Sequence, residues 1–250
     1  MILLLSGEGP TDLGHCDLSF SQCSNDESGT FISGVLTYII DDIFNSKMNY
    51  SIRETLNSVH FVHKSHLCEK IKKQSGGKKL VMMRGAKKAP ETNFYFNNAK
   101  SLGLIALELQ EKEKCPVIAI LFRDSDGTRS TPSNDWKTKY DSMVLGFDES
   151  GCNTGVPMLA KPKSEAWLLA ACKNDPYQHC NLLENESGND NSTNSLKNQL
   201  SERIGAHSSQ ALINWITNIK YDYTTVSKQM PSFTAFYQRF LTVLDECCKC

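Results

Sequence analysis

The sequence predicts an α/β fold, with a mostly parallel sheet, helices on both faces and a C-terminal helical extension. Two observations predict it. The runs 2–6 and 116–122 are continuously apolar, which is typical of strands covered on both faces. Between such runs lie segments whose apolar residues recur with helical spacing, so strands and helices alternate along the chain.

The composition is that of an ordinary globular protein, with 250 residues, 40% hydrophobic and 22% charged. No apolar run approaches the roughly 18 residues of a membrane helix, and the first residues lack the basic start of a signal peptide. We therefore expect a cytoplasmic protein without a membrane partner. Its ten cysteines should then be mostly free thiols, and their spacing does not indicate a zinc ribbon.

Apolar spacing predicts most of the remaining elements. Helices are expected at 31–44, 93–111, 134–146, 165–172, 210–219 and 231–247, and further strands at 59–62, 80–83 and 156–160. The Asn- and Ser-rich stretch 184–198 offers almost no core residues, so we expect a mobile insertion there. The chain is accordingly divided into a first domain, 1–175, and a second part, 176–250, whose helices pack on the first.

Acidic residues follow the two clearest strands. Glu8 lies in a Gly-Glu-Gly turn after the first strand, and Asp124 and Asp126 follow the strand 116–122. In open α/β sheets, ligands bind in the crevice outside the carboxyl ends of the strands. In an extended chain, Asp124 and Asp126 would point to the same side. Three carboxylates at one crevice repel one another unless a cation is present, and oxygen ligands suit Mg²⁺ or Mn²⁺. The pattern predicts a divalent metal site.

Structural explanations of these residues stay open. Glu8 would also be favoured near the start of a helix that Pro10 begins, and Asp-Ser-Asp-Gly is ordinary turn chemistry. A second cluster, His60, His63, His66 and Cys68, does not share one face of either a strand or a helix. That cluster is therefore not favoured as a metal site.

Three motifs carry a resemblance to a known family. The opening from Leu3 to Asp12 ends in Gly-Glu-Gly-Pro-Thr-Asp, and a hydrophobic strand with Asp-Ser-Asp follows about 115 residues later. This arrangement resembles the TOPRIM fold. It is most similar to the small stand-alone TOPRIM proteins related to the OLD-family nucleases, several of which also have a helix that opens like Glu165–Leu169 here. The resemblance covers roughly residues 1 to 175.

The resemblance implies Mg²⁺- or Mn²⁺-dependent hydrolysis of phosphodiester bonds in nucleic acid, with DNA favoured over RNA. Glu8 would match the family's acid, a metal ligand or general acid/base. Asp124 and Asp126 would match its metal-binding pair, and Glu165 the later acid that completes a second metal position. Two metals about 4 Å apart would stabilise the attacking and leaving oxygens.

The resemblance also bears on partners. Small TOPRIM proteins of this type are expected beside an ATPase, in antiviral or mobile-element systems. The chain shows no fused ATPase, no tyrosine-nucleophile domain and no zinc-binding primase module, so hydrolysis is favoured over topoisomerisation or primer synthesis.

Basic residues are concentrated in one segment. Lys70 to Lys88 holds eight Lys or Arg and no acid, while the whole chain has a net charge of −1. Such a segment suits local capture of a polyanion, although a solvated loop is the simpler explanation. Lys163 precedes the helix at 165 and would neutralise phosphate charge in the transition state. The residues expected to contact nucleic acid are Lys78, Lys79, Arg84, Lys87, Lys88 and Lys161.

Two other functions remain open. The segment 121–128 also resembles the first motif of haloacid-dehalogenase-type phosphatases, in which Asp124 would be the nucleophile and Asp126 the acid/base. That hypothesis leaves Glu8 and Glu165 without a role. The chain would alternatively be a non-catalytic partner that binds nucleic acid for an ATPase. A structural explanation also exists for Glu165, which complements the helix dipole if Ser164 is the N-cap, and Trp167 is expected in the core.

Overall fold

The computed structural model describes residues 1–250 except 18–19, 27, 75–91, 127–134, 206–207 and 250. Within these residues, five strands form a sheet in the order β3-β5-β1-β6-β7. The four strands from β5 to β7 are parallel, and β3 is an antiparallel edge. The strands are β1 (Ile2–Ser6), β3 (Gln22–Ser24), β5 (Val59–Val62), β6 (Val117–Asp124) and β7 (Gly155–Ala160). The expectation of an α/β fold with a mostly parallel sheet is confirmed.

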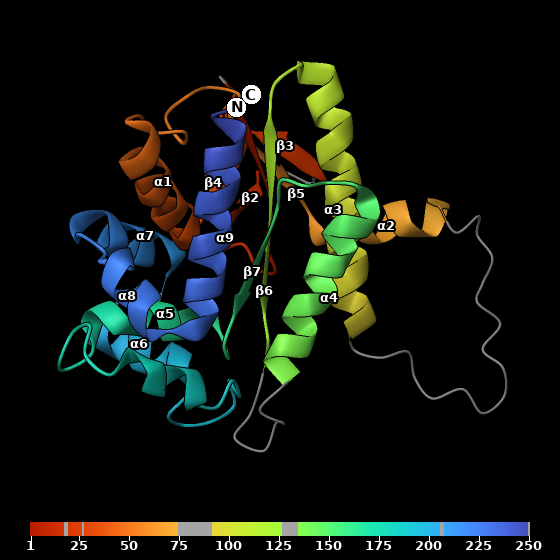
Figure 1. Ribbon diagram of the computed structural model, residues 1–250. Helices are drawn as coiled ribbons and strands as arrows, with labels where there is room; N and C mark the ends of the chain where they lie inside the picture. Colours follow the sequence, from red (N-terminus) through yellow and green to blue (C-terminus); the bar gives the residue numbers. More distant parts are fainter. Residues whose placement is uncertain (18–19, 27, 75–91, 127–134, 206–207, 250) are drawn as a thin grey trace, which may run out of the picture.

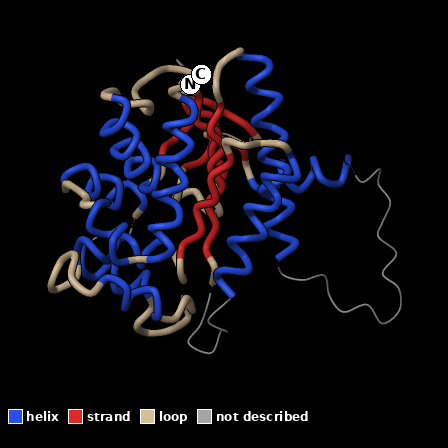
Figure 2. Tube along the Cα trace, viewed as in Figure 1, coloured by secondary structure: helices blue, strands red, loops and turns tan. Residues whose placement is uncertain are grey.

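Helices cover both faces of this sheet (Figures 1 and 2). Alternate residues of β1 pack on opposite faces of the sheet. Leu3 and Leu5 belong to one hydrophobic core, and Ile2 and Leu4 belong to the other. One layer holds α1 (Val35–Met48), α5 (Ser164–Cys172), α6 (Leu196–Ile204), α7 (Ser209–Asn218), α8 (Tyr223–Gln229) and α9 (Pro231–Cys247). The other holds α2 (Lys64–Gln74), α3 (Thr92–Glu113) and α4 (Asp135–Ser150). None of the helices described is both long and apolar enough to span a bilayer.

The first helix begins later than its apolar spacing predicts. Residues 31–33 instead form β4 (Phe31–Ser33), which pairs with β2 (Gly14–Cys16) in a two-stranded sheet. Gly34 then precedes α1, and a Cβ atom there would lie 2.3 Å from the carbonyl oxygen of Asp12. Only glycine permits that approach. Helix α2 and strand β3 were not expected, and the expected strand 80–83 lies outside the described residues.

The stretch expected to be a mobile insertion has defined contacts. It starts within a 3₁₀ helix, η1 (Cys180–Asn185), where Glu184 is 5% exposed and accepts hydrogen bonds from the N–H and hydroxyl of Ser232. Near its other end, the side chain of Ser195 caps α6 by accepting from the N–H of Asn198. Glu184 and Ser195 are thus buried polar residues held by hydrogen bonds, which the polar composition of the stretch does not reveal.

Trp167 of α5 joins the C-terminal helices to the sheet. Its side chain is fully buried and lies edge-on to Phe122 of β6 and Phe233 of α9. Its indole N–H donates to the hydroxyl of Ser232 at 2.8 Å. Trp167 is thus a core residue as expected, and residues on both sides of the 175/176 boundary share one hydrophobic core.

One pair of cysteines departs from the expectation of free thiols. Cys16 of β2 and Cys23 of β3 form a disulfide, with Cα atoms 5.6 Å apart, a separation that a disulfide spans readily. The seven other cysteines in the described part lie outside disulfides. This disulfide does not favour the expected cytoplasmic location, since disulfides are rare in reducing compartments.

Replacing Trp167 with Ala should destabilise the protein strongly, because it leaves a cavity between β6 and α9. We expect a loss of about 3 to 5 kcal/mol, which is a fall in melting temperature of roughly 6 to 20 °C for a chain of this length. Thermal unfolding followed by circular dichroism measures it. Trp215→Ala, at a partly buried position of α7, is the matched control, and an equal fall in both variants would contradict the central position of Trp167.

Candidate functional site

The order of the parallel strands reverses between β1 and β6. In chain order these strands are β1, β5, β6 and β7, and they lie in the order β5-β1-β6-β7. A crevice therefore opens outside the carboxyl ends of β1 and β6. Ser6, the last residue of β1, is in register with Leu121 of β6, and β6 continues to Asp124, so the loop after β1 passes beside the end of β6. There the Oε2 of Glu8 accepts from the N–H of Asp124 at 3.2 Å. The strand ends therefore bring these two expected residues together.

Ser164 lies among three further carboxylate contacts. Its N–H donates to Oδ1 of Asp124 at 3.0 Å, and its hydroxyl oxygen lies 3.5 Å from Oδ1 of Asp12 and 3.5 Å from Oε2 of Glu165. The expectation that Ser164 caps α5 is wrong, since Lys163 occupies the N-cap and Ser164 is the first helical residue. Asp124 accepts a first-turn N–H of α5, which gives this carboxylate a structural contact as well.

Asp12 belongs to the same cluster, although only its place in the Leu3–Asp12 motif drew attention to it. Its Oδ2 accepts from the N–H of Gly9 at 2.9 Å, which closes the loop after β1. Burial, together with the charges of Glu165 and Glu8, raises the pKa of Asp12 to about 6. Burial and the charges of Asp12 and Glu165 raise the pKa of Asp124 well above its ordinary value. Both shifts indicate negative charge that is not fully compensated.

Glu8 has the opposite shift, because it has a cationic partner. Its Oε1 pairs with the ammonium of Lys64, the first residue of α2, at 2.9 Å. Burial alone would raise the pKa of Glu8, but the hydrogen bonds from Lys64 and Asp124 leave it below its ordinary value. Glu8 is therefore ionised at neutral pH.

A buried arginine lies beneath these carboxylates. Arg123 is 0% exposed and donates to the carbonyl of Ser6 at 3.3 Å and to Oδ1 of Asn98 at 2.8 Å. Burial lowers the pKa of Arg123 to about 10, and the charge of Glu8 opposes that effect. The guanidinium thus stays charged at neutral pH. The sequence feature that could have pointed to Arg123 is its position at the end of an otherwise apolar strand.

Asp126 does not continue the alternation expected of an extended chain. Strand β6 ends at Asp124, and Asp126 has a φ of +50°, in the left-handed region. Its Oδ1 lies 3.4 Å from the ammonium of Lys163, which also pairs with Asp190 at 2.7 Å. Burial would lower the pKa of Lys163, but the hydrogen bond that its ammonium donates to Asp190 and the neighbouring carboxylates raise it. Both residues are therefore engaged with each other rather than with Glu8.

The cluster offers the oxygen ligands that Mg²⁺ or Mn²⁺ prefers. As the side chains are placed, no group of three or more His, Cys, Asp or Glu within the described residues could hold a metal ion. The contacts give the reason, since Glu8 is drawn to Lys64, Asp12 to Gly9 and Asp124 to Ser164. The chemistry of the donors fits, and binding would require Glu8 to turn from Lys64.

The expected nucleic-acid contacts fall mostly outside the described residues, which is where Lys78, Lys79, Arg84, Lys87 and Lys88 lie. Lys70, at the start of that basic segment, is in α2 and pairs with Glu108 of α3. Lys161 is partly buried. Burial raises the pKa of Glu184, and the charge of Lys161 opposes part of that rise.

Known proteins give no further guidance. Comparisons with family models, with curated proteins and with solved structures found no match.

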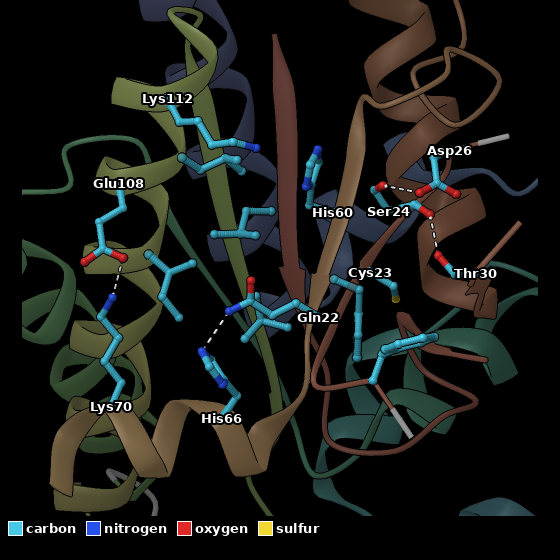
Figure 3. Close-up of a pocket in the computed structure, with 16 residues that line it drawn as sticks. Gln22, Cys23, Ser24, Asp26, Thr30, His60, His66, Lys70, Glu108 and Lys112 are labelled. Atoms are coloured by element: carbon cyan, nitrogen blue, oxygen red, sulfur yellow. Dashed lines mark hydrogen bonds and ion pairs between the residues drawn. The ribbon is translucent and has the colours of Figure 1, made fainter. Parts of the chain in front are cut away.

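A separate pocket of about 520 Å³ lies over β3 and β5, between α2 and α3 (Figure 3). Many of its polar side chains already have partners. Gln22 and His66 point toward each other and are 2.7 Å apart, Lys70 pairs with Glu108, and Asp26 accepts from Ser24. This pocket lacks the group of uncompensated carboxylates that distinguishes the crevice at β1 and β6.

Removing the charge of Asp12 should stabilise the metal-free protein at neutral pH. Because the pKa of Asp12 is raised to about 6, its ionisation opposes folding as pH rises from about 4 to 6, and the cost stays constant above that. Asp12→Asn should therefore be more stable than the parent at pH 8, by at most about 3 kcal/mol, and the difference should vanish near pH 4.

Thermal unfolding between pH 4 and pH 8 in the presence of a chelator measures this difference. Asp175→Asn, at an exposed position outside the cluster, is the control. A gain for Asp12→Asn that does not change with pH would show that Asp12 carries no raised pKa.

Proposed function

We propose that this chain is a metal-dependent nuclease that hydrolyses phosphodiester bonds in nucleic acid, with DNA favoured, and that it is related to the small TOPRIM proteins. One observation carries the proposal. The carboxylate of Glu8 accepts from the N–H of Asp124 at the point where the strand order reverses. The motifs from Leu3 to Asp12 and from Glu165 to Leu169 support the relationship.

The charges around the crevice favour this chemistry. Burial, and after it the charges of the neighbouring carboxylates, raise the pKa values of Asp12 and Asp124. A divalent cation, when bound, would supply Lewis-acid polarisation of a phosphoryl oxygen and lower the pKa of an attacking water. Its ligands would be Glu8, Asp124 and Glu165, as expected from the sequence, and Asp12. We leave Asp126 outside this set because it faces Lys163.

The chain's own residues would move the proton and contact the phosphate. Glu8, ionised at neutral pH, either holds the cation or accepts the proton of the attacking water. Lys64 lies 2.9 Å from Glu8, so its ammonium is available to a phosphate oxygen once Glu8 turns away. Arg123 fixes a buried positive charge below the carboxylates.

The two other functions make different demands on these residues. A phosphatase would need Asp124 as a nucleophile, yet Oδ1 of Asp124 already accepts from Ser164, and Glu8 and Glu165 would have no role. A non-catalytic partner of an ATPase would bind nucleic acid without cutting it. Assays that separate strand cleavage, binding and hydrolysis of p-nitrophenyl phosphate distinguish the three.

Glu8→Gln should fold normally and lose activity. The change keeps the shape and hydrogen-bonding reach of the side chain but removes the charge that holds a cation or moves a proton. We expect cleavage in Mg²⁺ or Mn²⁺ to fall by two or more orders of magnitude, the scale of roughly 10²–10⁴ on which general acid/base groups contribute. Cleavage of labelled single-stranded DNA, duplex DNA and RNA measures it.

Glu54→Gln is the matched control, because the side chain of Glu54 is 72% exposed and lies outside the crevice. If Glu8→Gln cuts as well as the parent, the proposed mechanism is wrong. If the parent binds nucleic acid but cuts none of the three substrates, with or without an ATPase partner, the non-catalytic function replaces the nuclease.

A further inference from the structure

A second pocket adjoins the carboxylates on the side of the C-terminal helices. It has a volume of about 240 Å³, and Asp12 and Glu165 form part of its wall. We call it the flanking pocket. Its other walls come from α1, α5, α6 and α7, with Thr11, Val35, Ser164, Leu168, Lys197, Leu200, Ser201, Ile204, Ser208, Ser209 and Leu212.

The flanking pocket is apolar on one side and polar on the other. Val35, Leu168 and Leu200 are buried core residues that present aliphatic surface to it. Ser201 and Ser208 supply hydroxyl groups, and the oxygen of Ser208 already accepts from the N–H of Ala211, so its O–H is left to donate. Aliphatic walls with a few hydroxyl groups suit a nucleobase and its sugar.

The charge at the rim suits a phosphate. Lys197 lies on the outer side of α6, is exposed, and makes no ion pair within the part of the chain described. Asp12 and Glu165 line the same pocket, so a strand whose scissile phosphate lies at the proposed metal site would place its next nucleotide in the flanking pocket.

The size of the flanking pocket limits what enters. Its volume of about 240 Å³ is below the roughly 300–1,000 Å³ of pockets for drug-sized ligands. It therefore admits one nucleotide and excludes a base pair. A nucleotide in a duplex would first have to leave its stack, which costs a few kcal/mol.

We propose that the flanking pocket receives one unpaired nucleotide next to the scissile phosphate, so that the substrate is single-stranded nucleic acid. This inference rests on the proposed function and names its substrate class. It also assigns a role to α6 and α7, which lie beyond the 1–175 segment that resembles the TOPRIM proteins. These helices form the pocket wall that would make the protein select an unpaired strand over a duplex.

Filling the flanking pocket tests the inference. Ser201→Leu places an aliphatic side chain in the pocket, and Glu202→Leu adds the same side chain at the next position of α6, outside it. The probes are a fluorescein-labelled ten-residue oligothymidylate and a labelled hairpin duplex. Binding is followed by anisotropy in Ca²⁺, and cleavage is followed separately in Mn²⁺.

We expect Ser201→Leu to weaken oligothymidylate binding by tenfold or more and Glu202→Leu to change it by less than twofold. The parent should bind and cut the oligothymidylate at least tenfold better than the hairpin. If Ser201→Leu does not fold, Ser209→Leu, at the exposed first residue of α7, replaces it with the same expectation.

The outcomes separate the two proposals. The flanking-pocket inference is overturned if Ser201→Leu binds the oligothymidylate as well as the parent does, or if the parent binds and cuts the hairpin equally well. Metal-dependent cleavage by the parent would still support the nuclease. A parent that cuts neither probe nor RNA, with or without an ATPase partner, overturns the proposed function. The binding measurement then still decides the pocket, since selective loss in Ser201→Leu supports it and no loss overturns it.

Discussion

The parallel pairing of β1 with β6 is the constraint on which the candidate site depends. Both strands are buried on both faces, and the pairing sets Ser6, the last residue of β1, opposite Leu121, so that β6 continues past the end of β1 as far as Asp124. Arg123 reinforces the pairing from within, because its guanidinium reaches from β6 to the carbonyl of Ser6. The hydrogen bond between Glu8 and the N–H of Asp124 follows from this register. A shift along either strand would separate them.

The electrostatics of the crevice follow from which carboxylates have a cationic neighbour. Glu8 pairs with Lys64, and the pKa of Glu8 is lowered. Asp12 and Asp124 have backbone and hydroxyl donors but make no ion pair with any residue that the structure describes, and burial and mutual repulsion raise their pKa values. The proposed cation would remove this repulsion, which is the physical reason to place a metal here rather than in the pocket over β3 and β5, whose charged groups are largely paired.

The sequence could predict the elements whose cause is local. Continuous apolar runs predicted β1 and β6, and the Pro231 start and aromatic spacing predicted α9 with its observed ends. Asp12 could not be assigned from spacing, because its position depends on distant contacts: the carbonyls of Thr11 and Asp12 accept from the first N–H groups of α1. The left-handed backbone of Asp126 could not be predicted, because the sequence alone does not show where the strand alternation breaks. Strands as short as β3 and β4 depend on tertiary pairing, which the sequence does not show.

Locating bound Mn²⁺ by anomalous X-ray scattering from crystals of the protein soaked in that ion tests the central claim most directly. The proposed function predicts an anomalous peak between the carboxylates of Asp124, Asp12 and Glu165, with Glu8 turned from Lys64 toward the ion. The peak should be lost in crystals of Asp124→Asn. An anomalous peak confined to another part of the molecule, or an unchanged peak in Asp124→Asn, would contradict it.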